Sequence, residues 1–173
     1  MDNAKTVWNI DATHSEINFK VKHMMISTVT GSFEKFDGKV EASNDDFKKG
    51  NFSFSAEIDS VNTNNKDRDN HLKSDEFFGA EKNPKLTFRS KSFDGNKMIG
   101  DLTIKGVTKE VELETEYNGT AVDPYGQTKA GFEFEGHINR KDFGLTWNAM
   151  TEAGSVVVSD KVKLIASLQF VKQ

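Results

Sequence analysis

The sequence has no cysteine, and it contains only 2 prolines, 2 tryptophans and 2 tyrosines. Without cysteine the chain forms no disulfide, uses no thiol nucleophile and builds no Cys-ligated zinc or iron–sulfur centre. It also lacks a basic excess, because the formal net charge is −4 and the lysines are scattered among acidic residues. We therefore expect no nucleic-acid partner. No apolar run approaches the roughly 18 residues of a membrane-spanning helix, so we expect no transmembrane segment.

The first five residues show no basic start followed by an apolar stretch, which a secretory signal would need. From this we expect a cytoplasmic protein, or a periplasmic or secreted one if the chain was trimmed ahead of Met1. At 173 residues the chain has the size of one domain, and it shows no internal repeat, linker or low-complexity tract. We predict a single domain over residues 1–173.

What the sequence does have is 14 phenylalanines and 13 glycines. Many Phe with few Tyr or Trp indicate a large apolar interior with few polar groups. Many Gly with few Pro are typical of strands joined by bends and turns.

The dominant pattern is an alternation of apolar and polar residues, which predicts strands with one buried face. It begins in a short strand at residues 7–10 and continues through Ile17, Phe19, Val21 and His23. A change of phase at Glu34 and Lys35 predicts a bulge or bend. Further alternating rows are Phe52, Phe54, Ala56, Ile58; Leu86, Phe88; Met98, Gly100, Leu102, Ile104; Val111, Leu113, Thr115, Tyr117; Phe132, Phe134, Gly136, Ile138; and Val162, Leu164, Ala166, Leu168, Phe170.

Eight or nine strands with one apolar face must cover that face. Only residues 64–79 look helical, with the acidic start Asp67-Arg68-Asp69 and an end before Pro84. One helix cannot cover so many strands. We therefore predict an all-β fold, an antiparallel eight-stranded barrel with one short helical segment over a mouth. A two-sheet sandwich is the alternative.

Candidate chemistry is sparse. The four histidines lack tight metal-ligand spacing, and Asp67-x-Asp69-x-His71 fits the first turn of a helix better than a metal site, so we expect no metal and no cofactor. The parity of His23 points it inward among apolar residues, where it needs a polar partner from the protein or from a ligand. Paired glutamates fall on the outer face, and no G-x-S-x-G, P-loop or G-x-G-x-x-G motif occurs.

The apolar row itself has two interpretations. Eight-stranded barrels lie at the size where the interior is either filled with side chains or holds one ligand. Phe-rich walls occur in both cases. The alternation alone leaves both open.

Four blocks of residues, in order along the chain, resemble the YceI-like family. They are Trp8-x-Ile10-Asp11-x-x-His14-Ser15-x-Ile17-x-Phe19-x-Val21-x-His23 followed by Gly31-x-Phe33; Asp69-x-His71-Leu72-x-Ser74-x-x-Phe77-Phe78 with Pro84-x-x-x-Phe88-x-Ser90; Gly100-x-Leu102-Thr103-Ile104-x-Gly106-Val107-Thr108; and Asn139-Arg140-x-Asp142-Phe143-Gly144.

The resemblance implies a lipocalin-like barrel with a long internal cavity that binds polyisoprenoids, prenyl quinones, prenyl pyrophosphates or fatty-acyl-type amphiphiles, with no catalytic activity. It also implies a possible homodimer. We expect the ligand-binding residues to be Phe19, Val21, His23, Phe33, Phe54, Phe88, Met98, Leu102, Phe132, Phe134 and Trp147, with His23 near a polar head and Trp147 at a mouth. The motif residues Asp11, His14, Asp69, His71, Arg140 and Asp142 more often tie strand connections together than touch cargo.

The main hypothesis is therefore a lipid carrier or store. Two others remain open. One is an enzyme acting on a lipid headgroup through His23. The other is a packed barrel that serves as a stress-related interaction module through the glutamates of residues 110–116.

Overall fold

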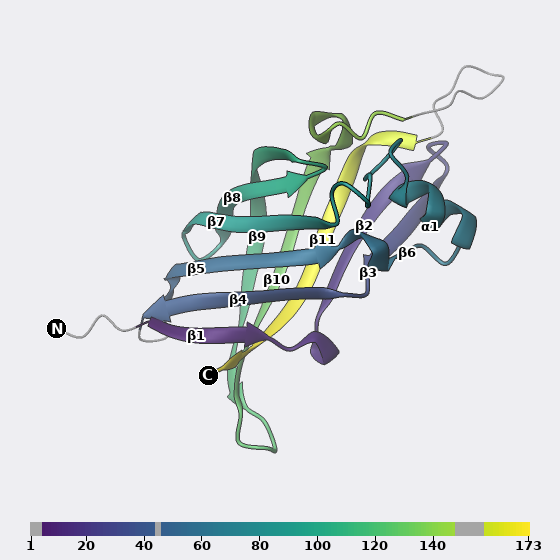
Figure 1. Ribbon diagram of the computed structural model, residues 1–173. Coiled ribbons are helices and arrows are strands. Elements are labelled where there is room, and N and C mark those ends of the chain that lie inside the picture. Colours follow the sequence, from purple (N-terminus) through teal and green to yellow (C-terminus); the bar gives the residue numbers. More distant parts are fainter. Residues whose placement is uncertain (1–4, 44–45, 148–157) are drawn as a thin grey trace.

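The computed structural model describes residues 5–43, 46–147 and 158–173 (Figure 1). The described strands are β1 Lys5–Ile10, β2 Glu16–His23, β3 Ser27–Phe33, β4 Phe36–Ser43, β5 Asp46–Glu57, β6 Val61–Asn62, β7 Lys85–Phe93, β8 Lys97–Ile104, β9 Val107–Val122, β10 Thr128–Asn139 and β11 Val158–Lys172. One α-helix, α1, spans Lys66–Lys73, and short 3₁₀ turns lie at η1 Ala12–His14, η2 Ile58–Ser60 and η3 Arg140–Phe143. Within these ranges no helix combines the length and the apolarity that a membrane crossing requires.

The strands form one antiparallel sheet that closes on itself. Its order is β1-β4-β5-β7-β8-β9-β10-β11-β2-β3-β6, with an additional pairing of β1 with β11. Three positions in the wall are each made by two consecutive strands. β1 and β2 share the first position, because both pair with β11. β4 pairs with β1 and β3 with β2, so they share the second position, and β5 and β6 share the third by pairing with β4 and β3. The result is the predicted closed antiparallel barrel of 8 strand positions.

Local breaks explain why three wall positions are split. Asp11 caps η1 between β1 and β2, where its side chain accepts a hydrogen bond from the Thr13 amide at 3.2 Å. Glu34 and Lys35 form a bend between β3 and β4, as the change of phase predicts. Between β5 and β6 the break is η2, where the Ser60 hydroxyl donates to the carbonyl of Glu57 at 2.6 Å.

The helix is shorter than the predicted residues 64–79. It begins after Asn65, whose side chain accepts a hydrogen bond from the Arg68 amide at 3.0 Å. It ends at Lys73 because Ser74 leaves the helical conformation and its hydroxyl donates to the carbonyl of His71. Turns then carry the chain back, with the Phe78 amide donating to the Leu72 carbonyl at 3.0 Å. The helix lies across one end of the barrel (Figure 1).

The opposite end of the barrel is filled by aromatic side chains. The Phe132 ring lies 5.1 Å from that of Phe47 and 5.3 Å from that of Phe52, both nearly perpendicular to it. Trp8, which is only 1% exposed, lies at the same end, and its ring centroid is 5.1 Å from that of Phe47. Such edge-to-face packing stabilises a core beyond the area it buries. This end, where β1 begins and β11 ends, is therefore closed.

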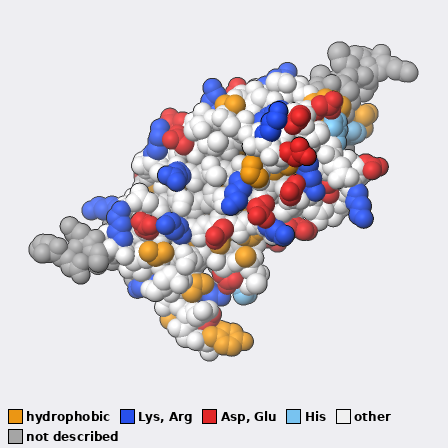
Figure 2. Space-filling view, in the orientation of Figure 1, with side chains coloured by type: hydrophobic (Ala, Val, Ile, Leu, Met, Phe, Trp, Pro, Cys, Tyr) orange, Lys and Arg blue, Asp and Glu red, His pale blue; other side chains and the backbone are white. Residues whose placement is uncertain are grey.

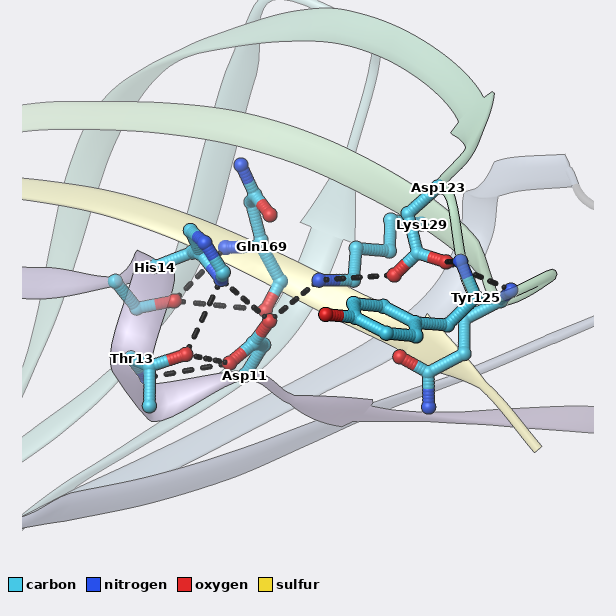
Figure 3. A network of polar contacts seen from close by, with 9 residues as sticks. Asp11, Thr13, His14, Asp123, Tyr125, Lys129 and Gln169 are labelled. Atoms are coloured by element: carbon cyan, nitrogen blue, oxygen red, sulfur yellow. Dashed lines mark hydrogen bonds and ion pairs between the residues drawn. The ribbon is translucent and has the colours of Figure 1, made fainter.

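A polar network ties the outside of the closed end together (Figure 3). The Lys129 ammonium lies between the carboxylates of Asp11 at 2.7 Å and Asp123 at 3.4 Å. It thus links η1 to the β9–β10 turn, where Asp123 also accepts the amide hydrogens of Tyr125 and Gln127. The hydrogen bond from Lys129 is the main reason that the pKa of Asp11 lies well below its usual range.

Candidate functional site

A cavity of about 470 Å³ occupies the half of the barrel that carries α1. That volume falls within the usual range of small-molecule sites. Its walls are inward-facing side chains from most of the barrel, among them Phe19 and Phe33, Phe54 and Phe88, and Leu102 and Phe134. The barrel interior therefore contains both a packed core and a cavity, one at each end.

Glycines in the wall leave room for the aromatic rings that line the cavity. Phe19 on β2 pairs with Gly31 on β3, and its ring lies where a Cβ atom of residue 31 would be. The ring of Phe88 lies in the same way over Gly100, 2.5 Å from the position of a Cβ there. Because these rings lie against the wall, they coat the cavity without filling it.

Aromatic side chains also narrow the mouth. The Trp147 ring lies 4.7 Å from the His71 ring and 5.3 Å from that of Phe77. His71 comes from α1, Phe77 from the turns that follow it, and Trp147 from the segment after η3. All three line the cavity, so the mouth is covered from two separate segments of the chain.

The polar groups of the cavity gather at this mouth. Lys22 and His23 come from the end of β2, and Asp67 and Arg68 come from α1. Arg68 is oriented by Thr63, because its Nε donates to the Thr63 hydroxyl at 2.8 Å and its Nη2 donates to the Thr63 carbonyl at 2.5 Å. An apolar interior with a polar rim suits a molecule with a long hydrocarbon part and a polar end.

Arg140 holds the chain segments at the rim of the cavity in place. It is 2% exposed and donates to four backbone carbonyls, those of Leu145 (2.6 Å), Trp147 (2.8 Å), Val158 (3.2 Å) and Ser159 (2.9 Å). Burial lowers the pKa of Arg140, and the nearby Asp160 carboxylate opposes this. An arginine nevertheless stays protonated, so a buried cation holds the segment that carries Trp147.

Sequence comparison gives the context for this cavity. A family model described as the YceI-like domain matches residues 8–170. The chain belongs to the YceI-like family. A UPF0312 protein from Staphylococcus epidermidis RP62A is 42% identical over 166 residues, covering 95% of this chain and 97% of that protein. A UPF0312 protein from Staphylococcus aureus N315 is also 42% identical, with the same coverage.

Solved structures share the YceI-like fold. A Campylobacter jejuni YceI protein has a TM-score of 0.73 at 35% identity and covers 88% of this chain and 90% of that one. Burkholderia cenocepacia BcnA has a TM-score of 0.78 at 22% identity, covering 92% and 98%. A domain from Saccharophagus degradans described as polyisoprenoid-binding has a TM-score of 0.70 at 18% identity, covering 96% and 98%. At such low identity, the last two show the fold alone.

Most of the residues predicted to bind a ligand in this YceI-like barrel line the cavity. Nine do so, namely Phe19, Val21, His23, Phe33, Phe54, Phe88, Leu102, Phe134 and Trp147. Whether they contact a ligand stays a prediction.

Met98 and Phe132 do not line the cavity. Met98 is fully buried and Phe132 is 1% exposed, both outside the set of lining residues. Their inward parity is as predicted. Phe132, however, belongs to the cluster with Phe47, Phe52 and Phe170 that fills the closed end.

His23 borders the cavity, but it is not buried among apolar residues as its parity predicts. It is the last residue of β2, it is exposed, and it pairs with Ser27 across the turn. At the end of the strand the side chain has left the barrel interior, so its imidazole needs no buried partner.

The sequence did not single out several residues that matter at the mouth. Arg68 was part of an expected helix start, and Phe77 was only part of a family motif. Val162 and Leu164 line the cavity from β11. They belong to one of the alternating rows of the sequence, but they are not among the residues predicted to bind a ligand. Signals for these residues were present, but the position of the helix over the mouth is a long-range property.

The motif residues mostly tie the chain together. His14 contacts Asp11 at 2.8 Å, and Asp69 accepts hydrogen bonds from the amide and hydroxyl of Thr63. His71 contacts Glu76 at 2.5 Å, so Asp69 and His71 have different partners. In the part of the chain that the structure describes, no group of three or more His, Asp or Glu residues is placed to hold a metal ion.

Proposed function

We propose that the barrel binds one long-chain apolar amphiphile, a polyisoprenoid, prenyl quinone or prenyl pyrophosphate, and acts as its carrier or store. The observation that carries this proposal is the cavity, which has apolar walls, one closed end and one mouth with polar groups. The naming of the Saccharophagus degradans neighbour as polyisoprenoid-binding supports the ligand class.

The energetics fit such a ligand. Burial of hydrocarbon gains about 25 cal/mol per Å², so burying roughly 300 Å² gains about 7 kcal/mol before the cost of ordering the chain. That gain is available to any flexible apolar chain that fits. Selectivity then comes from the head, which meets the charged rim groups Lys22, Asp67 and Arg68.

The two other hypotheses have less support. His23 is exposed, and within the described residues no hydrogen bond or ion pair to its side chain orients it as a catalytic base. The interaction-module hypothesis assumed a packed barrel, but half of this barrel holds a cavity. Two glutamates of β9 instead pair with neighbouring lysines, Glu110 with Lys91 and Glu112 with Lys97.

The test is to fill the cavity. Ala166 is 7% exposed and lines the cavity from β11, while Ser167, the next residue, faces outward. Ala166→Trp should weaken binding of a fluorescent geranylgeranyl probe by about tenfold or more, because the indole occupies the space of the chain. Ser167→Trp adds the same side chain outside and should bind as the wild type does. A folded Ala166→Trp variant with wild-type affinity would contradict the proposal.

A further inference from the structure

An exposed apolar tip lies next to the mouth of the cavity. The three residues of the turn between β2 and β3, Met24, Met25 and Ile26, are 37%, 63% and 80% exposed. Three consecutive large apolar side chains in water are unusual on a protein surface, and such patches mark interaction sites. We refer to residues 24–26 as the apolar tip.

The backbone conformation of the apolar tip does not favour the residue types found there. Met24 and Met25 have φ values of 52° and 59°, in the left-handed region that favours Gly, Asn and Asp. The Ile26 amide donates to the His23 carbonyl at 3.1 Å and closes the turn. Methionine here costs conformational energy and exposes apolar area, so the turn alone does not explain these residues.

The hairpin behind the apolar tip has an unusual charge. The chain carries a net charge of −4, yet no acidic residue occurs between Glu16 and Glu34. The same stretch contains two lysines, Lys20 and Lys22. Both lysines are exposed on β2. On the neighbouring β11, Lys163 lies opposite Lys20 and pairs with Glu135, and Asp160 pairs with Lys141 and lies 3.7 Å from Arg140. The hairpin itself is therefore purely basic.

The apolar tip continues directly into the rim of the cavity. Lys22 and His23, which precede it, both line the cavity. In Figure 1 the β2–β3 turn reaches the same end of the barrel as α1 and the start of β11. Anything that covers the apolar tip therefore also faces the mouth.

We propose that the apolar tip, with Lys20 and Lys22 behind it, docks the mouth of the barrel on an anionic lipid bilayer. Met25 and Ile26 enter the boundary between headgroups and acyl chains, as the apolar faces of interfacial proteins do. The lysines then lie within about 10 Å of the charged headgroups, where salt does not fully screen their attraction. A membrane-held lipid moves into the cavity without its chain crossing water. This last step rests on the proposed lipid-binding function, whereas the docking does not.

A second exposed apolar surface lies at the closed end of the barrel and serves as a comparison for the apolar tip. Val122 is 67% exposed and Tyr125 is 90% exposed, both at the turn that joins β9 to β10. That hairpin projects from the closed end of the barrel, and Figure 2 shows orange side chains on its tip. Asp123 lies between these two residues, and Glu116 is exposed on the same hairpin. Exposed apolar area there is accompanied by acidic residues and by Lys129, which pairs with Asp123, so this hairpin offers an anionic bilayer no purely basic surface.

The experiment is flotation of the full chain with vesicles of phosphatidylcholine alone or with one quarter phosphatidylglycerol. We expect the chain to float with the anionic vesicles and to be released by high salt. The double variant Met25→Ser/Ile26→Ser should lower this partitioning by about tenfold or more, because it removes the inserted area. The variant Val122→Ser/Tyr125→Ser should partition as the wild type does. In an Ile26→Trp variant, indole fluorescence should shift to the blue on adding anionic vesicles.

Several outcomes would overturn the docking proposal. One is the absence of flotation with anionic vesicles, and another is an equal loss of partitioning in both double variants. A third is a dimer that Met25→Ser/Ile26→Ser converts to a monomer, in which case a second copy covers the apolar tip. Lipid binding is measured separately, with the geranylgeranyl probe in detergent. A protein that binds the probe but not vesicles contradicts docking alone, and one that binds vesicles but not the probe contradicts the proposed function alone.

Discussion

At the scale of single residues, Arg140 has an unusual position, since its guanidinium is buried beside an apolar cavity. It donates to carbonyls of Leu145 and Trp147 on one side and of Val158 and Ser159 on the other. It therefore joins the segment after η3 to the start of β11. Removing the guanidinium would take one donor from each of these carbonyls, which is costly where a polar group has little access to water.

We predict that Arg140→Met lowers the free energy of unfolding by about 3 kcal/mol or more, because it removes the donor of four hydrogen bonds, one of them buried and three partly buried. Urea denaturation followed by tryptophan fluorescence measures this. Lys141→Met is the matched control, since Lys141 is the next residue of η3 and is exposed. Equal, small losses in both variants would show that Arg140 does not hold the mouth.

Asp11 makes a prediction about acid stability. Its pKa is lowered in the folded protein, mainly by the hydrogen bond from Lys129, so its ionised form stabilises the fold. That contribution is complete above the ordinary aspartate pKa of about 3.9 and is lost as pH falls further, towards the folded pKa.

Asp11→Ala should therefore lower stability at neutral pH by at least about 1 kcal/mol, through loss of the cap on η1. Its unfolding free energy should also fall less steeply than that of the wild type below about pH 4. Asp142→Ala serves as a control, because within the described residues the Asp142 side chain makes no hydrogen bond. Parallel pH profiles for wild type and Asp11→Ala would refute the role of this network.

At the scale of strands, the pairing of Phe19 with Gly31 sets the width of the cavity. We predict that Gly31→Ala costs about 1–3 kcal/mol of stability, because the new methyl group overlaps the Phe19 ring. The displaced ring turns into the cavity, so probe binding should also weaken. Gly131→Ala is the comparison, since a Cβ there meets nothing closer than 3.6 Å. Thermal melts and probe titrations distinguish the two, and identical behaviour would argue against this packing.

The alternation along the strands was sufficient to predict the closed barrel and which side chains face inward. It could not show which inward residues meet one another across the barrel. Phe19 and Phe132 have the same local pattern, yet Phe19 lines the cavity and Phe132 packs edge-to-face among Phe47, Phe52 and Phe170. The difference depends on residues far away in sequence, which approach only when strand register and closure are fixed.

His23 shows a second limit of the local pattern. Its parity continues the row of Phe19 and Val21, but β2 ends there and the side chain is exposed at the rim. Where a strand leaves the barrel wall is set by its partners, here the start of β11 and the turn to β3. The extent of α1 has a different, local cause, because the Ser74 hydroxyl ends the helix by donating to the His71 carbonyl.

At the scale of the whole molecule, the barrel separates two roles along its axis. The closed end supplies packing through aromatic rings and, outside, through the Asp11–Lys129–Asp123 network. The other end supplies the cavity, the polar rim and the apolar tip. Substitutions at the closed end are thus expected to change stability alone, whereas those around the cavity change binding and, at Arg140 and Gly31, stability as well. A cytoplasmic location and a homodimer stay predictions.

The most direct test of the lipid-binding proposal is to purify the protein from its own cells, extract it with organic solvent and identify the extract by mass spectrometry. We predict one kind of lipid with a long apolar chain, present at about one molecule per barrel and greatly reduced in the Ala166→Trp variant. An extract without lipid, from a folded protein that also fails to take up added prenyl lipids, would contradict the proposal.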